Sequence, residues 1–118
     1  MLISIQSRGF SLTEALENHV HKRLGFTLAR GGDRVRRVDV RLSDLNGPRG
    51  GIDKRCLIEV QLDGLASVVV EDIQSDLYSA VDRAAGRAGR TVMRRLALDS
   101  PRRGQAVAWQ ARRWQPDL

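Results

Sequence analysis

Two runs of alternating apolar and polar residues, joined by a tight-turn signal, constrain this chain more than any other feature of its sequence. The first run places apolar side chains at every second position: Cys56, Ile58, Val60 and Leu62. The second run continues the pattern: Ala66, Val68 and Val70. Asp63-Gly64 between them is typical of a β-hairpin. A period of two predicts half-buried strands, so the apolar face of this hairpin needs a covering layer.

Two further strands are predicted before the hairpin. Residues 2–8 alternate between apolar and polar side chains and form the first. In the second, Val38, Val40 and Leu42 share one side, and the other side is charged. The turn residues of Asn46–Gly51 predict a flexible loop between this strand and the hairpin.

A first helix is predicted between the first two strands. Ser11 and Glu14 have the spacing of a capping box, with Ser11 as the N-cap, and Gly31-Gly32 ends the helix. Its core-facing positions follow helical spacing: Leu12, Ala15, Leu16, Val20, Leu24 and Leu28. The connection is long enough to make the first two strands parallel.

A second helix follows the hairpin, from Ser75 or Asp76 until Asp99-Ser-Pro101 stops it. Its core-facing positions are Leu77, Val81, Ala84, Ala85, Ala88, Val92 and Leu96. The order β-α-β-β-β-α predicts an α/β two-layer sandwich, with two helices on one face of a four-stranded, mostly antiparallel sheet. We expect one domain over residues 1–98 and a flexible, basic tail over 99–118. Trp109 and Trp114 in this tail could stack on bases or simply be exposed.

Length and composition limit the number of domains and the cellular compartment. The 118 residues suit a single domain, and no apolar run approaches a membrane span. The N-terminus lacks the features of a secretory signal. The single cysteine, Cys56, cannot form an internal disulfide, and its place in a strand predicts a small buried apolar residue. We therefore expect a protein of the reducing cytoplasm.

The charge balance points to an anionic partner. Twenty Lys and Arg stand against 14 Asp and Glu, a net charge of +6, and only Lys22 and Lys54 among the cations are not Arg. A GC-rich genome would favour Arg over Lys, but it would not create the net charge. Arginine offers a planar fork of donors that matches phosphate, so a nucleic acid is the first candidate.

The second helix carries the sharpest functional signal. Arg83, Arg87, Arg90 and Arg94 are spaced by four, three and four residues and therefore share one side of the helix, with Arg95 beside them. Basic residues near a helix C-terminus also complement the helix dipole, but this explains only the last two. A row of this kind can follow a phosphate backbone. Because no base-reading motif accompanies it, recognition of RNA shape is favoured over recognition of bases.

No catalytic or metal-binding constellation is found. His19 and His21 diverge on a helix, and Cys56 has no partner at zinc spacing. No glycine-rich phosphate loop follows a strand. We therefore expect no enzyme activity, cofactor, metal or small-molecule substrate. The glycines Gly86 and Gly89 weaken the second helix. Either they allow close packing against the first helix or the sheet, which we favour, or they are sequence drift in a marginal helix.

Residues 1–98 resemble the ribosome hibernation promoting factors, also called ribosome-associated inhibitor or sigma-54 modulation proteins. The element order carries the resemblance, together with Leu12-Thr-Glu-Ala-Leu16 and, above all, Asp76-Leu-Tyr-Ser-Ala-Val-Asp82. Arg87, Arg90 and Arg94 follow where the family carries Lys or Arg. The shape expected for the domain is also similar to that of double-stranded-RNA-binding domains.

The resemblance implies a partner and a mechanism. Members of the family bind the small ribosomal subunit near the decoding region and silence translation in stationary phase or stress. By resemblance, Arg87, Arg90 and Arg94 contact ribosomal RNA, and Lys22 and Arg23 are weaker candidates. The chain resembles the short form, which lacks the dimerisation domain of long members, and we expect a monomer. Two other hypotheses remain open: a general module for duplex or structured RNA, and a regulatory domain that binds a protein through its sheet.

Overall fold

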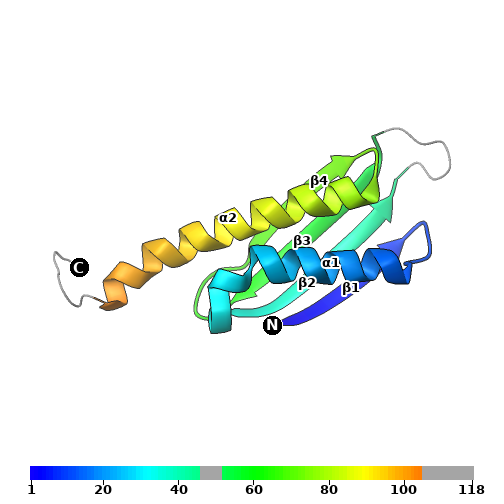
Figure 1. Ribbon diagram of the computed structural model, residues 1–118. Coiled ribbons are helices and arrows are strands. Elements are labelled where there is room, and N and C mark those ends of the chain that lie inside the picture. Colours follow the sequence, from blue (N-terminus) through cyan, green and yellow to red (C-terminus); the bar gives the residue numbers. More distant parts are fainter. Residues whose placement is uncertain (46–51, 105–118) are drawn as a thin grey trace.

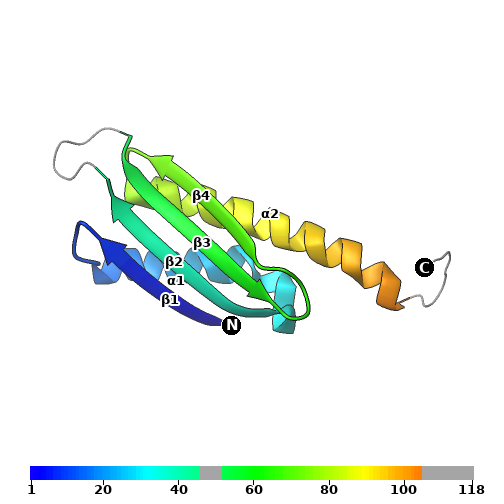
Figure 2. The ribbon, with the colours of Figure 1, turned by 180° about the vertical axis from the view of Figure 1, so that it is seen from behind.

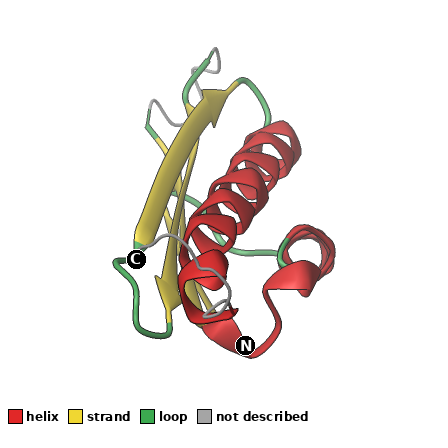
Figure 3. Ribbon diagram, turned by 90° about the vertical axis from the view of Figure 1, so that its left-hand side faces the viewer, coloured by secondary structure: helices red, strands yellow, loops and turns green. Residues whose placement is uncertain are grey.

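A computed structural model describes residues 1–45 and 52–104 of the chain, with side chains described up to residue 99. Two layers make up the fold (Figure 1): one is a four-stranded sheet, and the other is a pair of helices on one of its faces. The strands are β1 (Leu2–Arg8), β2 (Val35–Asp44), β3 (Lys54–Leu62) and β4 (Val68–Gln74). The helices are α1 (Glu14–Thr27), the short 3-10 segment η1 (Ala29–Arg34) and α2 (Leu77–Gly104). Seen along the layers, both long helices lie on the same side of the sheet (Figure 3).

The sheet has the predicted topology. Its strand order is β1-β2-β3-β4. The first pair is parallel, with Ile5 opposite Val40, and the other two pairs are antiparallel, with Val40 opposite Ile58 and Ile58 opposite Val70. These four apolar side chains share the face under the helices, as period-two alternation requires. The other face of the sheet is turned away from the helices (Figure 2).

Aliphatic side chains fill the space between the layers. α2 contributes Ala80, Val81, Ala84, Ala85, Ala88 and Val92, all of them 0% exposed. Apart from Ala80, these were predicted core positions, so the face assignment of this helix is confirmed.

Small residues bring α2 close to its neighbours. A Cβ on Gly89 would lie 2.6 Å from the carbonyl oxygen of Thr27, so this glycine permits direct contact between α1 and α2. Gly86 has no such role, because its nearest neighbour is the tip of Arg90.

Both predicted ends of α1 were wrong. The N-cap is Thr13, not Ser11: its Oγ1 accepts a hydrogen bond from the Leu16 N–H at 3.1 Å. The helix starts later because Leu12 packs against the core from the extended segment that precedes it. α1 ends at Thr27, and Gly31-Gly32 lies inside η1 instead. There the glycines serve the turn into β2, since Gly32 has a φ of +52° that favours glycine.

The predicted end of α2 was also wrong, because the helix continues through Asp99-Ser-Pro101 to Gly104. A proline removes one helical hydrogen bond, but helix propagation is cooperative and the preceding turns are anchored. One such anchor is Arg34 of η1, which donates a hydrogen bond to Asp99 at 3.2 Å. α2 therefore extends beyond the end of the sheet (Figure 1). The predicted tail begins within this helix, and residues 105–118, with both tail tryptophans, lie outside the described residues.

β4 begins two residues later than predicted, at Val68, and it runs on through Gln74. Glu71 and Asp72 therefore lie inside a strand. Their side chains point to opposite faces of the sheet. Asp72 lies on the helix side and is 8% exposed, whereas Glu71 is exposed on the outer face. This placement brings a buried carboxylate under the arginines of α2.

Candidate RNA-binding surface

The predicted arginine row lies on the side of α2 opposite its buried face. Arg83, Arg87, Arg90 and Arg94 are all exposed. Their spacing keeps them within a narrow stripe along the helix, opposite the buried face that contains Val81 and Ala88. The structure therefore places these four side chains together, as the spacing indicated, and the folded core leaves their guanidinium groups accessible.

The first half of the row is held by Asp72 of β4. Arg87 Nη2 donates a hydrogen bond to Asp72 Oδ2 at 3.0 Å, and Arg83 Nε lies 3.7 Å from the same oxygen. The Gln74 side-chain amide donates to the other carboxylate oxygen at 2.6 Å. A buried carboxylate needs such partners, because an unpaired charge in the interior is strongly disfavoured. Asp72 therefore neutralises part of the positive charge of Arg83 and Arg87.

The second half of the row has no such partner. Within the described part of the chain, no acceptor lies in hydrogen-bond or ion-pair distance of Arg90 or Arg94. Their charges are available to an external anion at no loss of an internal contact. Arg95, which was grouped with the row, turns toward the sheet, where it donates to the carbonyl oxygens of Ala66 and Ser67 at 3.1 and 3.4 Å. Its main role is thus to hold the segment before β4 against α2.

A hollow lined by residues of α1, α2 and β4 joins α1 to the arginine row. Its walls are Arg23, Asp72, Asp82, Arg83, Gly86, Arg87 and Arg90. Gly86 lies in this wall, and a Cβ there would be 3.4 Å from the tip of Arg90. Asp82 is next to Arg83 in the sequence, but it faces α1: its Oδ1 is 2.6 Å from His19 Nε2 and 3.3 Å from Arg23 Nε. This link fixes Arg23 at the mouth of the hollow.

Lys22 and Phe26 extend the surface along α1. Lys22 is exposed next to Arg23 but does not line the hollow. Phe26 was not predicted as a site residue, although it is 76% exposed and its ring centroid is 5.9 Å from the Arg23 guanidinium carbon. The sequence does hold a signal: Phe26 is off the apolar stripe of Leu16, Val20, Leu24 and Leu28. An exposed aromatic ring beside arginines can stack on a base.

We also searched the described residues for a metal site, a membrane-spanning helix and a reactive thiol. No group of three or more His, Cys, Asp or Glu side chains among them could hold a metal ion. None of the described helices is long and apolar enough to cross a membrane. Cys56 is buried as predicted, and burial, with a smaller contribution from the Asp72 charge, raises the pKa of its thiol to about 12. A protonated thiol of this kind is a poor nucleophile.

The surface so defined consists of Lys22, Arg23 and Phe26 on α1 and Arg83, Arg87, Arg90 and Arg94 on α2; we call it the helical surface. It offers guanidinium groups that match phosphate oxygens and one aromatic ring that can stack on a base. This chemistry suits the backbone and shape of a folded RNA.

Comparisons with known proteins show which family and fold the chain shares. Residues 3–97 match the family described as sigma 54 modulation protein / S30EA ribosomal protein. The N-terminal domain of Protein Y from Thermus thermophilus is 33% identical with a TM-score of 0.68, and the match covers 80% of this chain and 98% of that one. A ribosomal subunit interface protein from Coxiella burnetii shares the fold, with a TM-score of 0.71 at 18% identity over 82% and 99% of the two chains. A comparison with curated protein sequences found no match. The family match spans most of the chain, and the resemblance noted in its sequence is confirmed: the chain belongs to the sigma 54 modulation protein / S30EA ribosomal protein family.

Proposed function

We propose that this protein binds the small ribosomal subunit near the decoding region through its helical surface and silences translation in stationary phase or stress. The mechanism is occupancy: a folded domain between RNA segments excludes messenger and transfer RNA and needs no catalysis or cofactor. The Coxiella relative is described as a ribosomal subunit interface protein, which supports the same partner for this chain. Ribosome binding would place its action in the cytoplasm.

One observation carries the proposal most directly. Arg23 from α1 and Arg90 from α2 meet at one hollow, although they are 67 positions apart in the sequence. Arg94 continues the same stripe along α2. Arginines from two helices thus line one hollow, together with Asp72 and Asp82, and the exposed guanidinium groups could follow a phosphate backbone over more than a single contact. Each neutralised phosphate releases counterions, and several contacts together make binding strong at low salt and weak at high salt.

The test uses purified small subunits and a variant with three substitutions, Arg87→Glu, Arg90→Glu and Arg94→Glu. These reduce the net charge from +6 to 0. The matched control replaces Arg30, Arg36 and Arg37 with Glu, which gives the same net charge at exposed positions outside the helical surface. We expect the first variant to lose co-sedimentation and the control to keep most of it. Equal losses would mean that overall charge, not this surface, governs binding.

A competitor separates ribosome binding from general affinity for RNA. Excess free duplex RNA should displace the protein only weakly if the small subunit presents a shaped site. Complete displacement at equimolar duplex would favour a general duplex-binding module instead. The affinity for the subunit should also fall with rising salt, with a slope that shrinks by about 0.7–0.9 for each lost phosphate contact.

A further inference from the structure

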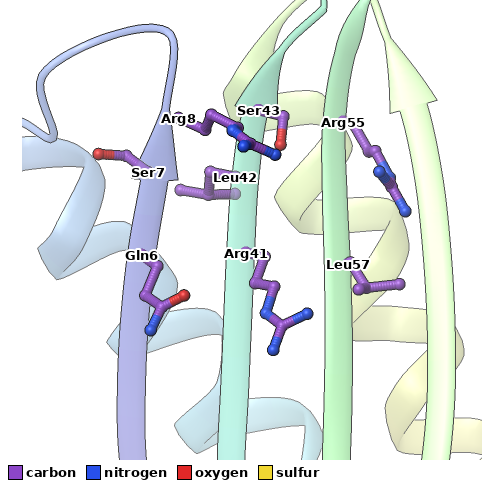
Figure 4. A pocket seen from close by; sticks show the side chains of 8 residues that line it. All are labelled: Gln6, Ser7, Arg8, Arg41, Leu42, Ser43, Arg55 and Leu57. Carbon is purple, nitrogen blue, oxygen red and sulfur yellow. The ribbon is translucent and has the colours of Figure 1, made fainter.

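The outer face of the sheet, opposite the helices, carries a second cationic feature. β1, β2 and β3 form a shallow hollow there (Figure 4), whose lining includes Gln6, Arg8, Arg41, Ser43, Arg55 and Leu57. These side chains belong to the face turned away from the helices, because they alternate with the buried Val40, Leu42, Cys56 and Ile58. Neither the arginine row nor α1 contributes to this hollow.

Two charges in this hollow are uncompensated by the described residues. Arg55 forms an ion pair with Glu71 on β4. Arg8 and Arg41 are both exposed, and no described acidic side chain lies within ion-pair distance of either. The other end of the same face differs, because Arg37 donates to Asp39 at 3.0 Å there. Positive charge on the outer face is therefore concentrated at the hollow.

The strand register arranges donors in two rows across the hollow. In one row, Arg8 lies opposite Ser43, which lies opposite Arg55; in the other, Gln6 lies opposite Arg41, which lies opposite Leu57. Neighbouring strands are about 4.8 Å apart and the two rows about 6.7 Å apart, from standard sheet geometry. Figure 4 shows Arg8 reaching from β1 toward Ser43 and Arg41 lying between Gln6 and Leu57. The donors thus cover a flat area, not a single point.

A flat, open array of this kind suits an extended polyanion better than a compact ligand. Arginine forks bind phosphate oxygens in pairs, and the Ser43 hydroxyl and Gln6 amide add neutral donors between them. Leu57 offers an apolar contact for a sugar or base. The row spacing allows separate phosphates of one strand to be bound. An acidic peptide would also find arginines here, but the hollow is mostly polar and offers no deep apolar pocket to anchor its side chains.

We propose that this hollow binds the sugar–phosphate backbone of a second RNA segment, so that the domain is held between two RNA segments, one on each face. The proposal rests on ribosome binding and deepens it. Contacts on the helical surface alone would fix the position of the domain. Contacts on two opposite faces would fix its orientation as well. A protein at the contact between separate parts of an RNA assembly needs two such faces.

The test is the double variant Arg8→Glu with Arg41→Glu, measured for affinity to purified small subunits. The matched control is Arg30→Glu with Arg36→Glu, which also lowers the net charge from +6 to +2. We expect the hollow variant to bind at least tenfold more weakly than the control and its salt slope to shrink by about 1.4–1.8, two contacts at 0.7–0.9 each. Thermal melting of both variants checks that they fold. An affinity and slope equal to those of the control would overturn the proposal.

The nature of the partner is tested by crosslinking. A benzophenone attached through Gln6→Cys lies at the rim of the hollow, while the native thiol of Cys56 is buried and unreactive. Crosslinks to ribosomal RNA support the proposal, and crosslinks to ribosomal protein alone would overturn it. The helical triple variant, run in parallel, separates the two hypotheses. If it loses binding and the hollow variant does not, only the second RNA contact is wrong; if neither loses binding, ribosome binding through RNA fails as well.

Discussion

The two halves of the arginine row on α2 differ in what they already contact. Arg83 and Arg87 reach over the sheet edge to the buried Asp72, so part of their charge stabilises the fold. Arg90 and Arg94 occupy the same stripe one to three turns further along and have no acidic partner among the described residues. The same residue type at the same spacing thus serves two purposes. Arginines that hold a carboxylate must give up a contact before they bind phosphate, and the others need not.

The largest expected effect separates the two halves directly. Replacing Arg90 and Arg94 with Ala should weaken small-subunit binding by about 2 kcal/mol, roughly thirtyfold, at unchanged stability, because two available phosphate contacts are lost. Replacing Arg83 and Arg87 with Ala should weaken binding less but lower the free energy of unfolding by about 1–3 kcal/mol, because Asp72 loses its charged partners. Subunit-binding titrations and urea unfolding measure the two effects. A thirtyfold binding loss in both pairs would remove the distinction between them.

A smaller effect on affinity is expected when the charge of Asp72, which contacts only Arg83 and Arg87 of the row, is removed. Asp72→Asn keeps an oxygen acceptor but abolishes the charge, so we expect a loss of about 1–2 kcal/mol in the free energy of unfolding. Ribosome binding should become several-fold tighter, because Arg83 and Arg87 are released for phosphate. The control is Asp33→Asn, the same charge change at an exposed position of η1. If both variants gain affinity equally, the gain is due to net charge, and Asp72 does not compete with the partner.

The fold and the arginine row on α2 could be predicted from the sequence. The side chains that these arginines contact could not. Alternation and helical spacing are local patterns, so the order of the elements, the face of Val81 and the stripe of arginines could be predicted. The pairing of Arg87 with Asp72 depends on how α2 lies across β4, and no local pattern encodes that placement. Asp82 illustrates the same limit: although it is next to Arg83 in sequence, its carboxylate turns to α1, where it forms a hydrogen bond with His19 and an ion pair with Arg23. The helix ends were missed for a related reason, since Ser11 and Thr13 are both competent caps and core packing of Leu12 decides between them.

The smallest effect concerns Phe26, on the α1 side of the same surface. Its ring is exposed, so Phe26→Ala should leave the free energy of unfolding nearly unchanged. Base stacking is worth about 1–3 kcal/mol, and we expect the lower end, roughly a fivefold loss of affinity, because the Arg23 guanidinium already lies near the ring. The slope of affinity against salt should stay that of the parent protein, since no charge is removed.

The conservative variant Phe26→Trp decides whether stacking is the cause. Trp keeps a flat aromatic surface and should retain parental affinity, whereas a contact that depends on the size of Phe would be disturbed by both substitutions. Subunit-binding titrations at two salt concentrations separate the cases. A changed salt slope in Phe26→Ala would mean that the ring acts by holding Arg23 in place. In that event the aromatic residue would belong with Asp72, as a residue that positions arginines, and the available contacts of the helical surface would be purely ionic.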